Sequence, residues 1–226
     1  FVASSNCILH CNAKIDFIDI NNEDFNIDID LVEKKLKKTP KNKLPKIIIP
    51  VHFAGKPYDQ KRLYNLSLKY KFKIIEDASH AIGALNDKQK VGNCKWSDVV
   101  VFSFHPVKII STGEGGATLT NNKKIDEKIK NLRTHGITRD LKKLNIKENG
   151  YWYYEQINLG FNFRMSDIHA ALGISQLKRI EKFIRHRNKI SKFYKKKLKN
   201  LPIGFQKINI NLRSSYHLFV IKLLNK

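Results

Sequence analysis

Apolar and polar positions alternate with two different periods along the first two thirds of the chain. Short apolar runs rich in Ile and Val predict five strands, at residues 14–20, 46–51, 73–77, 98–104 and 116–120. Apolar residues at helical spacing predict three helices, one capped by Asp28 or Asp30, one at 57–70 and one at 123–133. Strands that alternate with helices indicate an α/β fold, in which helices flank a mostly parallel mixed sheet.

From Ser166 onward the pattern changes. A Ser-Asp pair begins a long amphipathic helix, which we expect to break near Gly173. After a second break at 202–204, residues 216–224 predict another strand. The chain opens without Met and stops inside this strand pattern, so we expect a piece of a longer protein that lacks segments at both ends. The pattern predicts three parts: a large domain at 1–165, a connecting helical region at 166–200 and the start of a smaller C-terminal domain at 201–226.

The charge of the chain is strongly positive, with 43 Lys and Arg against 20 Asp and Glu. Only 8 of the 43 are Arg, and Lys, Ile and Asn together make up 84 residues spread over all segments. A nucleic-acid surface is typically localised and rich in Arg, so composition bias explains the charge better. A basic α/β nucleic-acid-binding protein is the alternative from another class. No apolar run approaches the roughly 18 residues of a membrane-spanning helix, and we expect no membrane partner.

Three cysteines are too few to form a disulfide framework in a chain of this size. Their scarcity favours a reducing compartment, and we expect a cytoplasmic protein. Cys7, His10 and Cys11 lie close enough to suggest a metal site, but no second pair of ligands accompanies them. We therefore expect no metal, and interpret this segment as a helix that buries small residues.

Chemically active side chains follow two neighbouring predicted strands. Asp77 ends the run KIIED, whereas Ser103 ends VVVFS, with Lys108 shortly after it and a glycine-rich turn at 112–116. Ligands of open parallel sheets bind at the carboxyl ends of strands. Each residue alone has an ordinary explanation, as a cap, a strand-end serine or a surface lysine. Together they offer what pyridoxal phosphate needs: an anion for its ring nitrogen, a donor for its phosphate and an amine.

Five longer segments extend this pattern over nearly the whole chain: VHFAGKPYD, IIEDASHAIGA, DVVVFSFHPVKIISTGEGGATLTNN, LRTHGI and LGFNFRMSDIHAALGISQL. In order and spacing they resemble the DegT/DnrJ/EryC1/StrS family of sugar aminotransferases. The resemblance implies the large domain of a fold type I aminotransferase that binds pyridoxal 5'-phosphate. It also implies amino transfer from glutamate to a UDP-linked 4-keto-6-deoxy sugar in pseudaminic-acid-type biosynthesis. Another 3- or 4-keto sugar nucleotide is the alternative within the family, whereas Lys108 argues against the related 3-dehydrases, which carry histidine there.

The resemblance also implies a role for individual residues. Lys108 would form the Schiff base with the cofactor and carry protons, and Asp77 would pair with the pyridinium nitrogen. His80 would lie near the 3-hydroxyl group of the cofactor.

Three further residues acquire a role in the same way. Ser103 would bind the cofactor phosphate and Phe1 would stack on its ring. Asn162 would reach the phosphate held by the neighbouring subunit, so the implied protein is a homodimer with a shared active site. The aromatic cluster at 151–154 would contact the uracil or sugar, or else pack its rings against its own domain.

Overall fold

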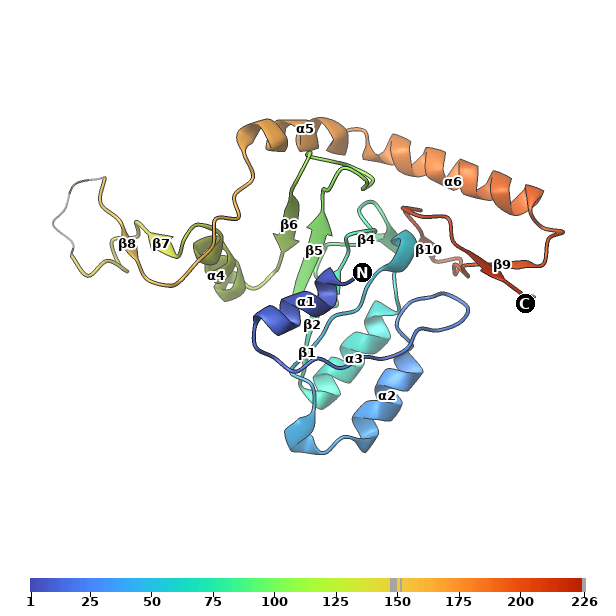
Figure 1. Cartoon of the computed structure of the whole chain (residues 1–226), viewed down its shortest axis with the longest axis horizontal. Coiled ribbons are helices and arrows are strands. Elements are labelled where there is room, and N and C mark those ends of the chain that lie inside the picture. Colours follow the sequence, from blue (N-terminus) through green and yellow to red (C-terminus); the bar gives the residue numbers. More distant parts are fainter. Residues whose placement is uncertain (147–149, 151, 225–226) are drawn as a thin grey trace.

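The central feature of the computed structural model is a four-stranded sheet with the order β1-β2-β5-β6 (Figure 1). The structure describes residues 1–146, 150 and 152–224. The strands are β1 (Ile47–Ile48), β2 (Lys73–Asp77), β5 (Val99–Ser103) and β6 (Gly116–Leu119). β1, β2 and β5 run parallel, and β6 is antiparallel to β5. The expected α/β fold with a mostly parallel mixed sheet is therefore confirmed.

Two helices, α2 (Ile29–Lys38) and α3 (Gln60–Tyr70), pack together beside β1 and β2. The side chain of Asp28 accepts hydrogen bonds from the backbone N–H groups of Asp30 and Leu31 and so begins α2, as expected. The apolar residues of this layer form one core cluster: Ile29, Val32, Leu36, Tyr58, Leu63, Leu66, Phe72 and Ile74. A second cluster, of Ala78, Ala81, Ala84, Val91, Cys94, Val100 and Phe102, lies beside the ends of β2 and β5.

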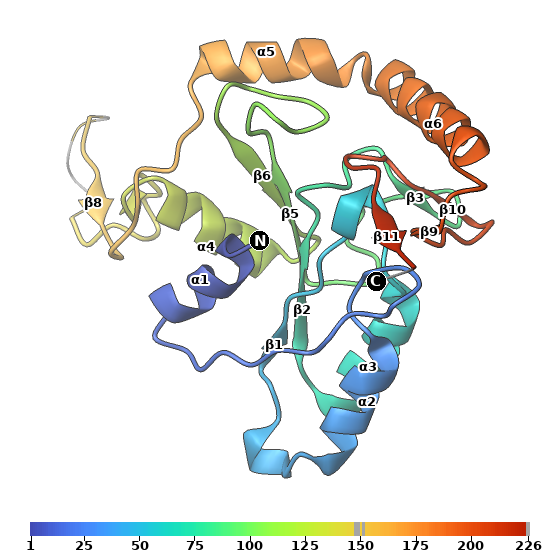
Figure 2. The ribbon, with the colours of Figure 1, turned by 45° about the vertical axis from the view of Figure 1, so that its right-hand side comes forward.

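The segment after helix α4 (Lys123–Arg133) extends away from the sheet in both views (Figures 1 and 2). It contains the antiparallel pair β7 (Ile137–Thr138) and β8 (Glu155–Gln156). We call the described residues 134–146, 150 and 152–166 the arm.

Helices α5 (Asp167–Leu177) and α6 (Ile180–Lys197) run across the top of the molecule (Figure 1). Ser166 caps α5 through its side chain, as expected. The break expected near Gly173 is wrong, because the two helices separate at residues 178–179. A Cβ atom at Gly173 would lie 2.7 Å from Cγ2 of Thr112, so this glycine allows α5 to approach the loop after β5.

The C-terminal segment folds back toward the sheet. β9 (Ile203–Phe205) pairs with β11 (Ile221–Leu223), and β10 (Leu212–Arg213) joins the hairpin of β3 (Leu85–Asn86) and β4 (Gln89–Lys90). The strand expected at 216–224 is mostly wrong. Tyr216 has a left-handed backbone conformation, with φ of 47°, which interrupts an extended strand.

Two N-terminal expectations are also wrong. Residues 14–20 form no strand beyond a single bridge at Ile20, because Asp16 and Asp19 accept hydrogen bonds from the following backbone N–H groups instead. Cys7, His10 and Cys11 do lie in or beside a helix, α1 (Ala3–His10), but this helix buries none of its residues.

The remaining short elements are 3₁₀ turns at Lys41–Lys43 and Phe53–Gly55. Pro50 shortens β1 relative to the expected 46–51, since proline donates no ladder hydrogen bond. Within the described ranges, no helix is both long and apolar enough to cross a membrane. Among the same residues, no group of three or more His, Cys, Asp or Glu side chains could hold a metal ion.

Candidate cofactor site

The parallel pairing of β2 and β5 brings the two candidate strand ends together. Asp77, the last residue of β2, is in register with Val101, and Ser103 follows at the end of β5. The chain then turns through Lys108, whose backbone N–H donates to the carbonyl of His105 at 2.9 Å. At the end of this loop, the backbone N–H of Thr112 donates to the carbonyl of Phe104, just after β5, at 3.0 Å. The loop after β5 therefore stays beside the sheet edge on which Asp77 lies.

Asp77 is a half-buried carboxylate with two hydrogen-bond donors. The Ser4 hydroxyl donates to its Oδ2 at 2.5 Å, and the backbone N–H of Ser79 donates to Oδ1 at 3.0 Å. Burial alone would raise the pKa of Asp77, but the hydrogen bonds from Ser4 and Ser79 outweigh it and hold the pKa below its usual value. The site therefore contains a stable anion.

Lys108 is half-buried, and in the described part of the chain its Nζ has neither a hydrogen-bond partner nor an ion-pair partner. Burial lowers the pKa of this amine, and the negative charge of Asp77 opposes the shift only in part. Lys108 is consequently easier to deprotonate than an exposed lysine.

His80 lies beside these two groups, in the turn that follows β2. Its pKa is lowered to about 4, because burial and the positive charge of Lys108 disfavour the imidazolium more than Asp77 stabilises it. The His80 ring lies 4.3 Å, centroid to centroid, from the ring of His217 in the C-terminal segment. His217 was missed by the sequence analysis. A histidine within an apolar run was the one available signal.

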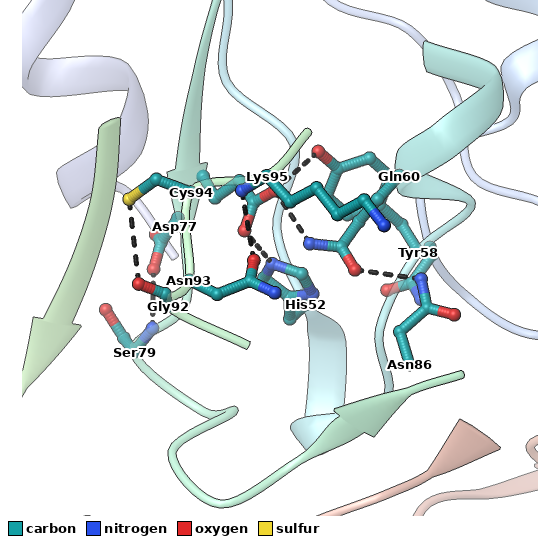
Figure 3. Close-up of polar contacts among 12 residues, drawn as sticks. His52, Tyr58, Gln60, Asp77, Ser79, Asn86, Gly92, Asn93, Cys94 and Lys95 are labelled. Atoms are coloured by element: carbon teal, nitrogen blue, oxygen red, sulfur yellow. Dashed lines mark hydrogen bonds and ion pairs between the residues drawn. The ribbon is translucent and has the colours of Figure 1, made fainter. Parts of the chain in front are cut away.

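A buried polar network that includes His52, Tyr58 and Gln60 lies to one side of Asp77 (Figure 3). Glu76, the neighbour of Asp77 on β2, is 1% exposed and points to the opposite face of the sheet. Its carboxylate accepts hydrogen bonds from His52 Nε2 at 2.9 Å, from Gln60 at 2.8 Å and from the Tyr58 hydroxyl at 3.2 Å.

The same network is tied to the backbone of Asp77. The backbone N–H of His52 donates to the Asp77 carbonyl at 3.0 Å. Since Glu76 and Asp77 are adjacent on one strand, the contacts to Glu76 also fix the strand end that carries the Asp77 carboxylate.

The other residues singled out in the sequence lie at different distances from this cluster. Ser103 is half-buried, and its hydroxyl oxygen accepts a weak hydrogen bond from the backbone of His105 at 3.4 Å. Phe1 is 99% exposed at the start of α1, and its amino group is close enough to lower the pKa of His80. Ser4, on the same helix, makes the contact to Asp77 described above.

Asn162 does not join the cluster within this chain. It is exposed on the arm, where its backbone bridges Thr134. None of the described contacts connects it with Asp77 or Lys108. Of the aromatic cluster, Tyr151 lies outside the described residues, while Trp152 and Tyr154 are exposed rather than packed against their domain.

The arm exposes an unusual amount of apolar surface. Phe161 and Phe163 stack on each other with centroids 4.8 Å apart, and both are exposed. Leu159 is 89% exposed, and Ile168 at the start of α5 is 82% exposed. A shallow hollow nearby is lined by Thr134, Ile137, Arg139, Tyr154 and Arg164.

The residues of the sheet edge fit pyridoxal phosphate. The cofactor requires an ionised carboxylate, an available amine and a hydroxyl at a strand end, and this sheet edge contains all three. His80 adds an enclosed Nδ1 atom that has no partner in the described residues. Gly113 and Gly115 have positive φ values of 81° and 150°, a conformation that lets the glycine-rich loop fold back over this edge.

Comparisons with known proteins point the same way. The model of the DegT/DnrJ/EryC1/StrS aminotransferase family matches residues 1–226. Over 224 residues the chain is 42% identical to the UDP-4-amino-4,6-dideoxy-N-acetyl-beta-L-altrosamine transaminase of Campylobacter jejuni, covering 99% of this chain and 56% of the relative.

Two solved structures share the fold. Helicobacter pylori PseC, described as an aminotransferase involved in the biosynthesis of pseudoaminic acid, superposes with a TM-score of 0.87 at 32% identity over 99% of this chain and 56% of its own. The PLP-form of Spr1654 from Streptococcus pneumoniae, a sugar aminotransferase by its description, superposes with a TM-score of 0.82 at 27% identity, covering 99% and 58% of the two chains. The chain thus spans little more than half the length of the proteins that it matches.

Proposed function

Because this chain belongs to the DegT/DnrJ/EryC1/StrS aminotransferase family, we propose that it carries the cofactor site of a pyridoxal-phosphate-dependent transaminase. The proposed reaction transfers an amino group from glutamate to a UDP-linked 4-keto-6-deoxy sugar of the pseudaminic acid type. The names of the C. jejuni and H. pylori relatives support this substrate. The observation that carries the proposal is that an ionised Asp77 and a half-buried Lys108 amine, which has no partner among the described residues, lie at the same end of the sheet.

Lys108 is the proposed attachment point of the cofactor and the proton carrier of the reaction. In one half-reaction its Nζ would move a proton from the α-carbon of the amino donor to the bound cofactor. In the other it would move a proton from the cofactor to C4 of the sugar. Both the attachment and the proton abstraction require a neutral amine, which burial favours. Bound pyridoxal phosphate supplies an electron-withdrawing ring that stabilises the carbanion formed when the proton leaves.

Asp77 is the proposed partner of the ring nitrogen. Its carboxylate is held in one orientation by Ser4 and Ser79 and stays ionised, so it can keep a proton on that nitrogen. His80, next to it, is the proposed neighbour of the 3-hydroxyl group.

The remaining contacts to the cofactor belong to the same proposal. Ser103 and the glycine-rich loop would hold the phosphate, and Phe1 would cover the ring. Asn162 would reach the phosphate of a second copy, since within its own chain it contacts none of these groups. The exposed apolar surface around Phe161 and Phe163 supports a homodimer in which each arm lies at the partner's site.

Two further expectations remain predictions. All three cysteines are free thiols, which fits the reducing environment of the cytoplasm. The division into parts at 1–165, 166–200 and 201–226 would assign the last 26 residues to the start of a smaller C-terminal domain.

Reductive trapping tests the proposed attachment point. The purified protein with pyridoxal phosphate should absorb in the near-ultraviolet to visible range as a cofactor bound to an amine, and glutamate should abolish this absorbance. In a separate sample that has not been exposed to glutamate, borohydride should fix the cofactor to the chain, and peptide mapping should find it on Lys108. The control variant Lys90→Ala, at an exposed position, should react like the parent. A reduced adduct on a different lysine would overturn the assignment.

A further inference from the structure

His80 and His217 form a ring pair that joins the cofactor site to the C-terminal segment. The ring planes are inclined by 33° and their centroids lie 4.3 Å apart, which is close packing for two imidazoles. His80 lies in the turn after β2, and His217 lies between β10 and β11. No step of the proposed reaction uses His217 directly.

The backbone around His217 is fastened on two sides. The Ser215 hydroxyl donates to the carbonyl of His80 at 2.8 Å, and the Ser215 N–H donates to the carbonyl of Gly55 at 3.0 Å. From helix α6, the Arg187 guanidinium donates to the carbonyl of His217 at 3.3 Å. The segment also lies so close to Gly55 that a Cβ atom there would meet the backbone nitrogen of Tyr216 at 2.9 Å. The position of His217 is therefore built into the fold.

Each ring has one buried nitrogen that forms no hydrogen bond within the described residues. Nδ1 of His80 and Nδ1 of His217 are shielded from solvent and have no hydrogen-bond partner in the described residues. An enclosed N–H without an acceptor is costlier than an enclosed lone pair, so this arrangement favours the neutral tautomer with its proton on Nε2. The open Nε2–H of His80 is then the donor available to a ligand.

We infer that His217 is a positioning residue of the cofactor site, whose flat ring fixes the plane of the His80 ring and keeps water away from its Nδ1 side. In this role His217 never touches the reacting atoms. It makes His80 a fixed, neutral hydrogen-bond donor. That donor acts on the oxygen next to the reacting carbon of the cofactor, a use that rests on the proposed function.

The surrounding charges agree with a neutral pair. Burial, His80, Lys108 and Arg187 all lower the pKa of His217, to about 4. The groups that act on His80 are Lys108 and the terminal amine, which lower its pKa, and Asp77, which raises it. Burial is the largest cause for both rings. Removing the His217 ring should admit water and let the pKa of His80 rise toward its ordinary value.

The test compares three substitutions by the NMR titration of His80 in the protein without cofactor. His217→Phe keeps a flat ring and should leave the pKa of His80 low. His217→Leu fills the space without a flat ring, and His217→Ala empties it, so both should raise the pKa of His80. The control His186→Ala removes an exposed histidine of α6 and should change nothing.

Cofactor binding provides the second readout. We expect the dissociation constant for pyridoxal phosphate to rise about tenfold in the Leu and Ala variants. In the Phe variant it should rise less than about twofold. An unchanged pKa of His80 in the Leu variant, or an equal rise in the Phe and Leu variants, would overturn the inference. Because the titration needs no cofactor, it tests His217 even if the parent protein binds no pyridoxal phosphate, an outcome that would instead refute the proposed function.

Discussion

The sheet-edge cluster and the arm differ in how completely one chain can build them. Around Asp77, every polar side-chain group of the supporting Glu76 network has a partner among the described residues except the enclosed Nδ1 of His52. The arm, in contrast, presents Leu159 and a pair of stacked phenylalanines to solvent. Buried polar groups need hydrogen-bond partners within the folded chain, whereas a large exposed apolar surface indicates that another molecule covers it.

This difference explains where the proposed ligands of the cofactor lie. Lys108, Asp77 and His80 converge inside one chain, because neighbouring parallel strands bring their ends to one edge. Asn162 lies on the part of the chain that extends away from this edge (Figure 2). One chain therefore supplies the chemical half of one site and, under the proposed function, the phosphate-binding arm of another.

The largest effect on activity is expected from a substitution in the sheet-edge cluster, at Asp77. Asp77→Asn keeps the size of the side chain but removes the negative charge that would keep the ring nitrogen protonated. We expect a loss of transamination rate of about a thousandfold, within the range of general acid–base contributions. Asp98→Asn, at the opposite end of the same sheet, is the control and should leave the rate nearly unchanged. If the Asp77→Asn variant had nearly the same turnover rate as the parent, Asp77 would have only a structural role.

A smaller effect is expected from the network behind the cluster. Burial would raise the pKa of Glu76, but His52, Gln60 and Tyr58 outweigh it and hold the pKa below the ordinary 4.5. Glu76→Gln removes the carboxylate that accepts the three hydrogen bonds and should lower the free energy of unfolding by about 3 kcal/mol, since buried donors lose their charged acceptor. Glu181→Gln, which breaks a surface pair with Arg213, should cost less than about 1 kcal/mol.

The depressed pKa of Glu76 also predicts how the stability of the parent and of Glu76→Gln should depend on pH. A carboxylate with a depressed pKa stabilises the fold at pH values above its unfolded-state pKa, and this contribution is lost as the pH falls through the folded-state pKa. The parent should therefore lose stability as the pH falls below about 4.5, the ordinary Glu pKa, and Glu76→Gln should lose less over that interval. Denaturant unfolding at several pH values measures both. Identical slopes for parent and variant would contradict an ionised Glu76.

The smallest expected effect concerns the arm. Phe163→Ser removes one ring of an exposed stack that makes no contribution to the core, so the stability of the chain should stay nearly constant. If the arm is covered by a second copy, self-association should weaken about tenfold in sedimentation equilibrium. Ile210→Ser removes an equally exposed apolar side chain far along the sequence and is the control. Equal association of both variants would place the dimer contact elsewhere.

The parts of the fold that local patterns predicted are those that local chemistry determines. Residues 73–77 are a strand because an apolar run is bounded by charged residues, and Asp28 and Ser166 cap helices with their own side chains. Residues 14–20 carry the same alternation, but their aspartates bond to adjacent backbone groups and no strand lies beside them in the described structure. Gly173 resembles a helix breaker, although it serves the contact with Thr112.

The candidate site divides in the same way. Asp77 and Lys108 could be predicted, because strand ends of a parallel sheet meet whatever the rest of the chain does. His217 and the partnership of His52 with Glu76 could not, since each depends on segments brought together only by the finished fold. The spacing of residues along the sequence does not predict such contacts.

The central claim is that the two regions form one site only across two copies, and mixing two defective variants tests it most directly. Lys108→Ala removes the proposed proton carrier, and Asn162→Asp would set a carboxylate against the cofactor phosphate, so each variant alone should be inactive. After subunit exchange, a mixed dimer contains one site with both an intact Lys108 and an intact Asn162. The account predicts that about a quarter of the parent activity returns, since half of the dimers are mixed and each has one good site of two. No recovery of activity, despite demonstrated exchange, would contradict a site shared between the two regions.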